Sequence, residues 1–184
     1  MKFFGGAVRE ILTFIVLAVV IVVPIRFFIA QPFVVEGESM HPTFEGGDYL
    51  VVDQLTYHFN DPKRGDVVIF RYPGDPSVFY IKRIIGLPGE TVNVDRGRTS
   101  ITKADGSTII LNESYVVAED ATYTVTTNLG DDEFFVMGDN RPRSSDSRVW
   151  GALPRHDVIG RAFVRLLPTA HASILPGSLK EVAP

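Results

Sequence analysis

The chain has 184 residues, which is enough for one sizeable domain with an appendage. Its formal net charge is only −4, and without a Lys/Arg cluster the sequence argues against nucleic-acid binding. There is no cysteine and the four histidines are dispersed, which argues against disulfide scaffolds and metal sites, so we expect neither a metal nor a cofactor.

The first element is an apolar stretch, residues 11–30, that begins ten residues into the chain. Twenty residues of helix span about 30 Å, the thickness of a bilayer core, so the stretch predicts a transmembrane anchor. Basic residues within positions 1–10 place that segment in the cytoplasm by the positive-inside rule, with the rest of the chain on the extracytoplasmic or periplasmic side. The alternative is a cleavable signal peptide, which the length of the run and the bulky residues at its end disfavour.

Beyond the anchor, short apolar or alternating runs separated by turn residues predict β-strands. These runs are Tyr49–Val52, Val67–Phe70, Phe79–Ile81, Thr91–Val94, Ile101–Lys103, Thr108–Leu111, Tyr123–Thr127, Phe134–Met137 and Ala162–Leu167. The segment Ala104–Gly106 reads as a hairpin tip. We therefore expect a mostly β fold, a coiled β-sheet or partly closed barrel, behind one N-terminal transmembrane helix.

Composition divides the part after the anchor into three segments. Residues 31–94 and 131–167 are expected to form the main β-domain, which would carry any catalytic residues. Residues 95–130 are rich in Thr, Asp, Asn, Ser and Gly, and we expect an inserted β-subdomain there. Residues 168–184 have little to bury and predict a mobile tail.

Ser39 is the first candidate catalytic residue, nine residues past the apolar stretch. Its surroundings nearly match a Gly-x-Ser-x-Gly elbow, but His41 stands where the second glycine belongs. Pro42 occupies the lysine position of a Ser-x-x-Lys motif. Taken alone, Ser39 is therefore best interpreted as a loop serine.

Lys82 changes that interpretation, because it lies beside Arg83 in a strand of bulky apolar residues. Alternation places Lys82 on one face with Tyr80 and Ile84, and Arg83 on the other, without saying which cation is buried. Burial lowers the pKa of a lysine, and a neutral amine can take a proton from a serine hydroxyl. The alternative is an edge strand on which both cations prevent aggregation.

The segment 138–148 follows the predicted strand Phe134–Met137 and combines Gly, Asp, Asn, Arg and Ser. Such loops commonly brace their own backbone through side-chain hydrogen bonds. One of its serines could also orient a lysine amine.

Four segments together resemble the bacterial type I signal peptidases, the leader peptidase family of serine–lysine proteases. The first is Ser39–Thr43, which matches the family's Ser-Met-x-Pro-Thr motif. The others are Gly65–Phe70, Tyr80–Glu90 and Gly138–Gly151, and Glu90 stands where aspartate is common in the family. The resemblance extends from the anchor to about Leu167.

The resemblance implies a role for each matching residue. Ser39 corresponds to the nucleophile and Lys82 to the neutral general base. Ser144 corresponds to a serine that hydrogen-bonds the lysine amine, and Asp146 with Arg148 to a pair that braces the loop. We expect shallow substrate pockets for small side chains, lined by Met40, Phe33, Val34, Ile81 and Ile84.

One position departs from some members of the family. Where these carry a serine whose hydroxyl completes the oxyanion hole, this chain has Gly37, as other members do. The Ser39 N–H would supply one oxyanion donor, and the second is unassigned.

The implied activity is that of a membrane-anchored endopeptidase that removes N-terminal signal peptides from exported preproteins at the outer face of the cytoplasmic membrane. Its partners would be these preproteins and the phospholipid bilayer, and we expect a monomer. Two alternatives stay open: a self-cleaving serine–lysine protease related to repressors, and a membrane-anchored β protein that binds extracytoplasmic partners. The anchor argues against the first, because such proteases are soluble.

Overall fold

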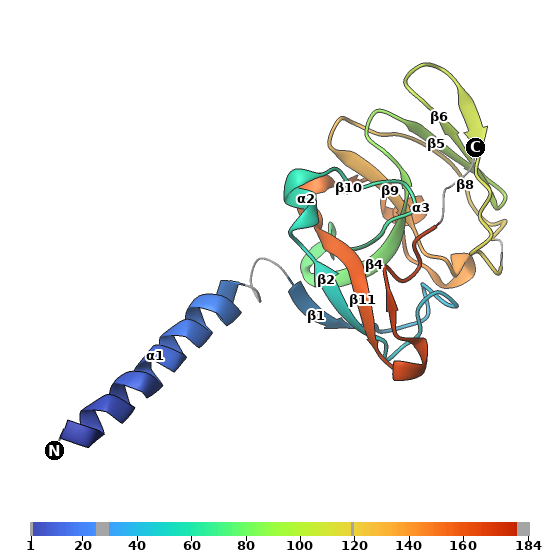
Figure 1. The fold of residues 1–184 in the computed structure, drawn as a ribbon. Coiled ribbons are helices and arrows are strands. Elements are labelled where there is room, and N and C mark those ends of the chain that lie inside the picture. Colours follow the sequence, from blue (N-terminus) through green and yellow to red (C-terminus); the bar gives the residue numbers. More distant parts are fainter. Residues whose placement is uncertain (1, 25–29, 119, 180–184) are drawn as a thin grey trace.

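The computed structural model describes residues 2–24, 30–118 and 120–179, and side chains within residues 8–22, 31–118 and 120–179. The fold is mostly β, as predicted, with two antiparallel sheets, one long N-terminal helix and a few short helical turns (Figure 1).

The larger sheet has eight strands in the order β1-β2-β11-β3-β4-β9-β10, with β12 paired to β11 outside this path. Their bounds are β1 Ala30–Val34, β2 Tyr49–Asp53, β3 Val67–Tyr72, β4 Asp75–Gly86, β9 Glu133–Met137, β10 Leu153–Pro154, β11 Val158–Leu167 and β12 Ser173–Ile174. Among the described strands, β1 and β10 lie at the two ends of the path and do not pair with each other. The sheet is therefore open rather than a closed barrel.

The smaller sheet has four strands in the order β7-β6-β5-β8. Their bounds are β5 Thr91–Asp95, β6 Arg98–Thr102, β7 Thr108–Ile110 and β8 Thr124–Asn128. The hairpin predicted at Ala104–Gly106 joins β6 to β7. We expected Thr91–Val94 in the main domain, but β5 pairs with β6 and β8, so this strand belongs to the smaller sheet.

An apolar cluster joins the two sheets. It contains residues of the larger sheet (Ile85, Phe135 and Met137) and residues of the segment 92–129 (Val92, Val94, Ile101, Leu111 and Leu129). Two further clusters lie within the larger sheet, one around Phe44 and Leu50 and the other around Phe70 and Phe134. The smaller sheet is thus packed onto the larger one by the alternate inward residues of its strands.

The long helix is α1 Lys2–Pro24, and two single-turn helices are α2 Thr56–Phe59 and α3 Ser147–Trp150. The 3-10 turns are η2 Arg141–Arg143, η3 Arg155–Asp157 and η4 Thr169–His171. All described side chains of α1 are exposed. No helix in the described residues is both long enough and apolar enough to span a membrane. Part of the predicted anchor, residues 25–29, lies outside the described residues.

The described part of the predicted tail, residues 168–179, contains η4 and the strand β12, which pairs with β11 at Val164 and Arg165. The alternative of a charged edge strand is wrong, because β4 lies between β3 and β9 and buries both Lys82 and Arg83. Residues 180–184 lie outside the described residues.

We predict that Ile101→Ala lowers the free energy of unfolding by about 2–5 kcal/mol, because it leaves a cavity in the cluster that joins the sheets. Ile110→Ala on β7 is the matched control, since that side chain is exposed and its loss should change stability by less than about 0.5 kcal/mol. Urea unfolding of both variants measures the difference. Equal effects would contradict the packing described for the smaller sheet.

Candidate active site

Ser39 and Lys82 lie together although 43 positions separate them, with Lys82 Nζ 2.8 Å from Ser39 Oγ. Ser39 is in the loop that follows β1 and is partly buried, whereas Lys82 is on β4 and 4% exposed. Lys82 Nζ also donates to the carbonyl of Ile81 at 2.9 Å and lies 5.0 Å from the centre of the Tyr80 ring. These contacts hold the amine in one position, directed at the serine hydroxyl.

Burial lowers the pKa of Lys82 from its ordinary value to about 8. The cause is desolvation of the ammonium form, and the nearby carboxylates of Asp146 and Asp139 oppose it by raising the pKa. A substantial fraction of the amine is therefore neutral near pH 8, and a neutral amine can accept the proton of a serine hydroxyl.

Backbone contacts join the loop 138–148 to the loop that carries Ser39. Asn140 N–H donates to the Ser39 carbonyl at 3.0 Å, and the Asn140 side-chain amide donates to the Glu38 carbonyl at 3.0 Å. Gly138 makes this approach possible, because a Cβ there would lie 2.4 Å from the Ser39 carbonyl oxygen. An exposed ion pair between Arg143 and Glu38 adds a further link.

Asp146 braces the loop 138–148 from within. Its carboxylate accepts the Gly138 N–H at 3.1 Å and caps α3 by accepting the Arg148 N–H at 3.2 Å. It also accepts two hydrogen bonds from the buried guanidinium of Arg148, at 2.8 and 2.9 Å. Arg148 in turn donates to the Arg141 carbonyl at 2.6 Å, so the two ends of the loop are tied together.

Ser144 lies in the same loop, and its buried hydroxyl makes no hydrogen bond to any residue that the structure describes. A Cβ on Gly138 would lie 2.3 Å from Ser144 Oγ, so the hydroxyl packs directly on the backbone next to Ser39. The resemblance implies that Ser144 orients the Lys82 amine, and this role stays a prediction.

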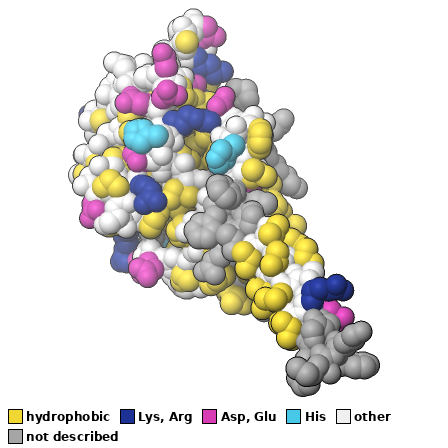
Figure 2. Space-filling view, turned by 90° about the vertical axis from the view of Figure 1, so that its left-hand side faces the viewer, with side chains coloured by type: hydrophobic (Ala, Val, Ile, Leu, Met, Phe, Trp, Pro, Cys, Tyr) yellow, Lys and Arg dark blue, Asp and Glu magenta, His cyan; other side chains and the backbone are white. Residues whose placement is uncertain are grey.

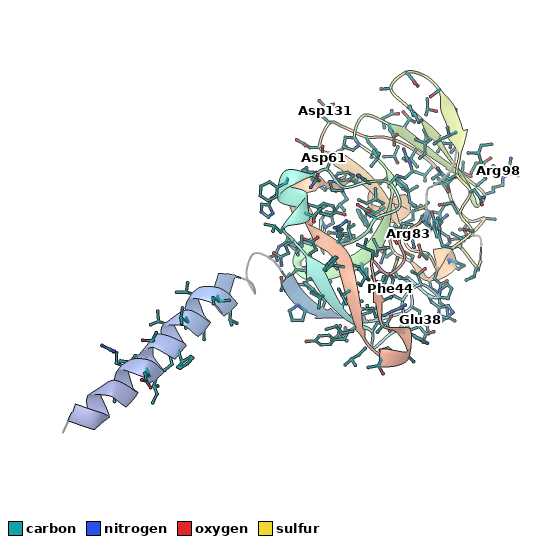
Figure 3. All side chains as sticks on the ribbon, viewed as in Figure 1. Glu38, Phe44, Asp61, Arg83, Arg98 and Asp131 are labelled. Carbon is teal, nitrogen blue, oxygen red and sulfur yellow. The ribbon has the colours of Figure 1, made fainter. Side chains whose placement is uncertain are left out.

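A buried ion pair that we did not predict involves Arg83, the residue next to Lys82 on β4. Arg83 is fully buried and donates twice to the Asp139 carboxylate, at 2.8 and 2.6 Å. Asp139 also accepts the Thr43 hydroxyl at 2.5 Å. Figure 3 shows Arg83 inside the β body, above Phe44 and Glu38 in this view. The sequence signal for this pair was the Lys82-Arg83 doublet in an apolar strand.

A cleft of about 600 Å³ opens at Ser39 and Lys82. Its walls come mainly from the segment 33–39 and from β4, and they include three of the predicted pocket residues, Phe33, Val34 and Ile81. The cleft is thus mainly apolar near β1 and β4 and polar at Glu38, Arg143 and Ser145.

Met40 and Ile84 were also predicted to line the pocket, and the structure places both elsewhere. Met40 is buried in the core cluster around Phe44 and does not line the cleft. Ile84 is buried in the apolar cluster around Phe70 and Phe134 and does not line the cleft.

The backbone N–H of Ser39 makes no hydrogen bond within the described part of the chain. It is therefore free to donate to a group placed in the cleft. Gly37 has a φ of 79° and lines the cleft without a side chain that could supply a second donor.

Comparison with known proteins adds an independent finding. The family described as "Signal peptidase, peptidase S26" matches residues 8–167. A signal peptidase I of Leptolyngbya laminosa is 42% identical over 83% of this chain and 76% of its own length. A signal peptidase I of Bacillus amyloliquefaciens is 40% identical over 73% of this chain and 74% of its own length.

We predict that Lys82→Met raises the free energy of unfolding at pH 7 by about 1–3 kcal/mol, because a buried ammonium destabilises the fold. The folded-state pKa of about 8 lies below the value of about 10.4 for unfolded lysine, so the unfolded chain binds more protons between these values. Wild-type stability should therefore rise with pH in this window, and the advantage of Lys82→Met should shrink.

Urea unfolding at several pH values between 7 and 10.5 measures this effect. Lys103→Met is the control, since Lys103 is exposed. A difference between Lys82→Met and wild type that does not change with pH would contradict the lowered pKa.

Proposed function

The chain belongs to the signal peptidase family, peptidase S26, and we propose that it removes N-terminal signal peptides from exported preproteins with a Ser39–Lys82 dyad. The observation that carries the proposal is the 2.8 Å approach of a buried lysine amine to a serine hydroxyl at the floor of a cleft. Family membership supports a peptidase, and the geometry supports these two residues as its catalytic pair.

The proposed reaction is acyl transfer in two halves. Ser39 Oγ attacks the carbonyl carbon of the scissile bond while neutral Lys82 takes the hydroxyl proton. Lys82 then gives that proton to the departing amine of the mature protein, which leaves the signal peptide as an ester on Ser39. A water molecule, deprotonated by Lys82, attacks the ester, and the proton returns to Ser39 Oγ as the signal peptide leaves.

The Ser39 N–H is the first proposed oxyanion donor, supported by its lack of a partner within the described residues. Gly37 cannot supply a side-chain donor, so the second donor is not assigned. The apolar walls at Phe33, Val34 and Ile81 would receive the small side chains that precede the cut.

Three residues of the loop 138–148 have proposed supporting roles. Asp146 and Arg148 fix the backbone of Gly138, which contacts Ser39. Ser144 would direct the Lys82 amine once a substrate is bound, and its unpartnered buried hydroxyl supports this role, because buried hydroxyls are normally hydrogen-bonded.

We further propose that α1 and the residues after it anchor the chain in the cytoplasmic membrane by a single pass. The support is the apolar stretch of residues 11–30 and the exposed apolar side chains that cover the described part of α1 (Figure 2). The N-terminus would then be cytoplasmic and the β body extracytoplasmic, acting as a monomer. Anchoring both enzyme and signal peptide in one bilayer raises their effective concentration.

We predict that Ser39→Ala and Lys82→Ala each lower kcat by at least about 100-fold, because each removes a reacting group. For the wild type, kcat/KM should rise as pH increases through about 8, where Lys82 becomes neutral. Cleavage of a labelled preprotein in detergent measures both effects, with Lys103→Ala as the control. Normal cleavage by either dyad variant would refute the assignment.

We also predict that Ser144→Ala lowers kcat by about 10-fold or more with little change in KM, because an undirected amine is a poorer base. Ser145→Ala is the matched control, since Ser145 is exposed at the rim of the cleft. Steady-state kinetics on both variants separate the two serines. Equal kcat values for the two would remove Ser144 from the mechanism.

A further inference from the structure

The segment that follows β11 folds back against the site region. After η4 the chain returns as β12, and Leu175 N–H donates to the Phe163 carbonyl at 2.6 Å. Pro176 is buried, and Gly177 has a φ of 75° that carries the chain inward. We define residues 173–177 as the C-terminal strap.

The strap supplies an acceptor to the buried arginine beside Lys82. The Gly177 carbonyl accepts from Arg83 Nη1 at 2.5 Å, and the Gly65 carbonyl accepts from the same nitrogen at 2.9 Å. The remaining nitrogens of Arg83 donate to Asp139. A fully buried guanidinium is costly unless its donors are satisfied, so the Gly177 carbonyl helps to keep Arg83 in place.

The strap also contacts the loop that carries Ser39. A Cβ at Gly177 would lie 2.6 Å from the Thr43 methyl carbon, closer than real Cβ atoms approach. The hydroxyl of Thr43 donates to Asp139, the partner of Arg83. Gly177 therefore contacts both ends of a short network, Thr43–Asp139–Arg83, that joins the loop after Ser39 to the strand of Lys82.

We propose that the C-terminal strap is a positioning element of the reaction, which fixes Ser39 relative to Lys82 through Thr43, Asp139 and Arg83. The proposal rests on the dyad proposed above. It makes Gly177 a positioning residue: the residue touches no substrate, and only a glycine fits the space beside Thr43.

Displacement of the strap has a predicted electrostatic signature at Lys82. If Arg83 shifts away from Asp139, the Asp139 carboxylate is less neutralised and acts more strongly on the lysine. Water admitted beside Lys82 would also favour its charged form. Both effects raise the pKa of Lys82, so the acidic limb of the pH profile should move to higher pH.

The test compares two alanine substitutions at glycines with positive φ. Gly177→Ala clashes with Thr43, whereas Gly106→Ala, at a hairpin tip with φ 82°, has no atom within 4 Å of the new Cβ among the described residues. Both variants carry the same kind of backbone strain, so they should lose similar stability from that source. For Gly177→Ala we expect kcat to fall by about 10–100-fold and the acidic limb of kcat/KM to shift upward, with neither change in Gly106→Ala.

A rescue variant separates this route from general destabilisation. Thr43→Ser removes the methyl group that the new Cβ would approach to 2.6 Å but keeps the hydroxyl that donates to Asp139. The two other close contacts of that Cβ, Phe44 Cε2 and Val67 Cγ2 at 3.3 Å, need shifts of only a few tenths of an ångström. The double variant should recover kcat and the wild-type acidic limb, relative to Gly177→Ala alone. Thermal unfolding of each variant is measured alongside the kinetics.

Three outcomes would overturn the strap proposal. These are a wild-type pH profile and kcat in Gly177→Ala, a similar shift in Gly106→Ala, and a defect or failure to fold in Gly177→Ala that Thr43→Ser does not relieve. None of these outcomes contradicts the proposed Ser39–Lys82 dyad as long as Lys82→Ala is inactive. Activity in Lys82→Ala would instead refute the proposed function whatever Gly177→Ala does.

Discussion

Burial of the Lys82 amine next to Ser39 is the constraint on which the arrangement of the site depends. An amine withdrawn from water titrates at lower pH, and its charged form destabilises the fold, so the surrounding residues must exclude water while leaving the amine within reach of one hydroxyl. Lys82, on β4 between β3 and β9, is only 4% exposed. The loop 138–148 lies against the Ser39 backbone at Gly138.

Three arginines of the site region, Arg83, Arg141 and Arg148, are buried, and each is paired with a carboxylate. Their guanidinium groups donate to backbone carbonyls as well as to acids, so they fix loops as well as balance charge. The carboxylates of Asp139 and Asp146 lie near enough to act on Lys82, yet both are already bound to arginines. This compensation allows burial to dominate the pKa of the lysine.

The sequence predicted the mostly β fold, since alternating runs and turn residues identified nine of the twelve strands in the described part of the chain. It missed β1 and the two-residue strands β10 and β12, because they are too short or too close to the apolar stretch to show alternation. For the site, the motifs around Ser39 and Lys82 named residues that the structure brings together. The contacts of Arg83 with Gly177, and the burial of Met40 and Ile84, depend on tertiary packing that no local pattern records.

The segment between β7 and β8 shows why an insertion in a chain can become indispensable. It provides Glu113, which binds Arg141, and Asp120, which binds Arg148, while the rings of Tyr115 and Tyr123 lie over Arg83 and Arg148. A shorter connection would leave all three arginines, Arg83, Arg141 and Arg148, with fewer partners. The acidic residues of this connection and the arginines that they bind therefore depend on each other. A change that removes either member of such a pair would leave the other without its charged partner.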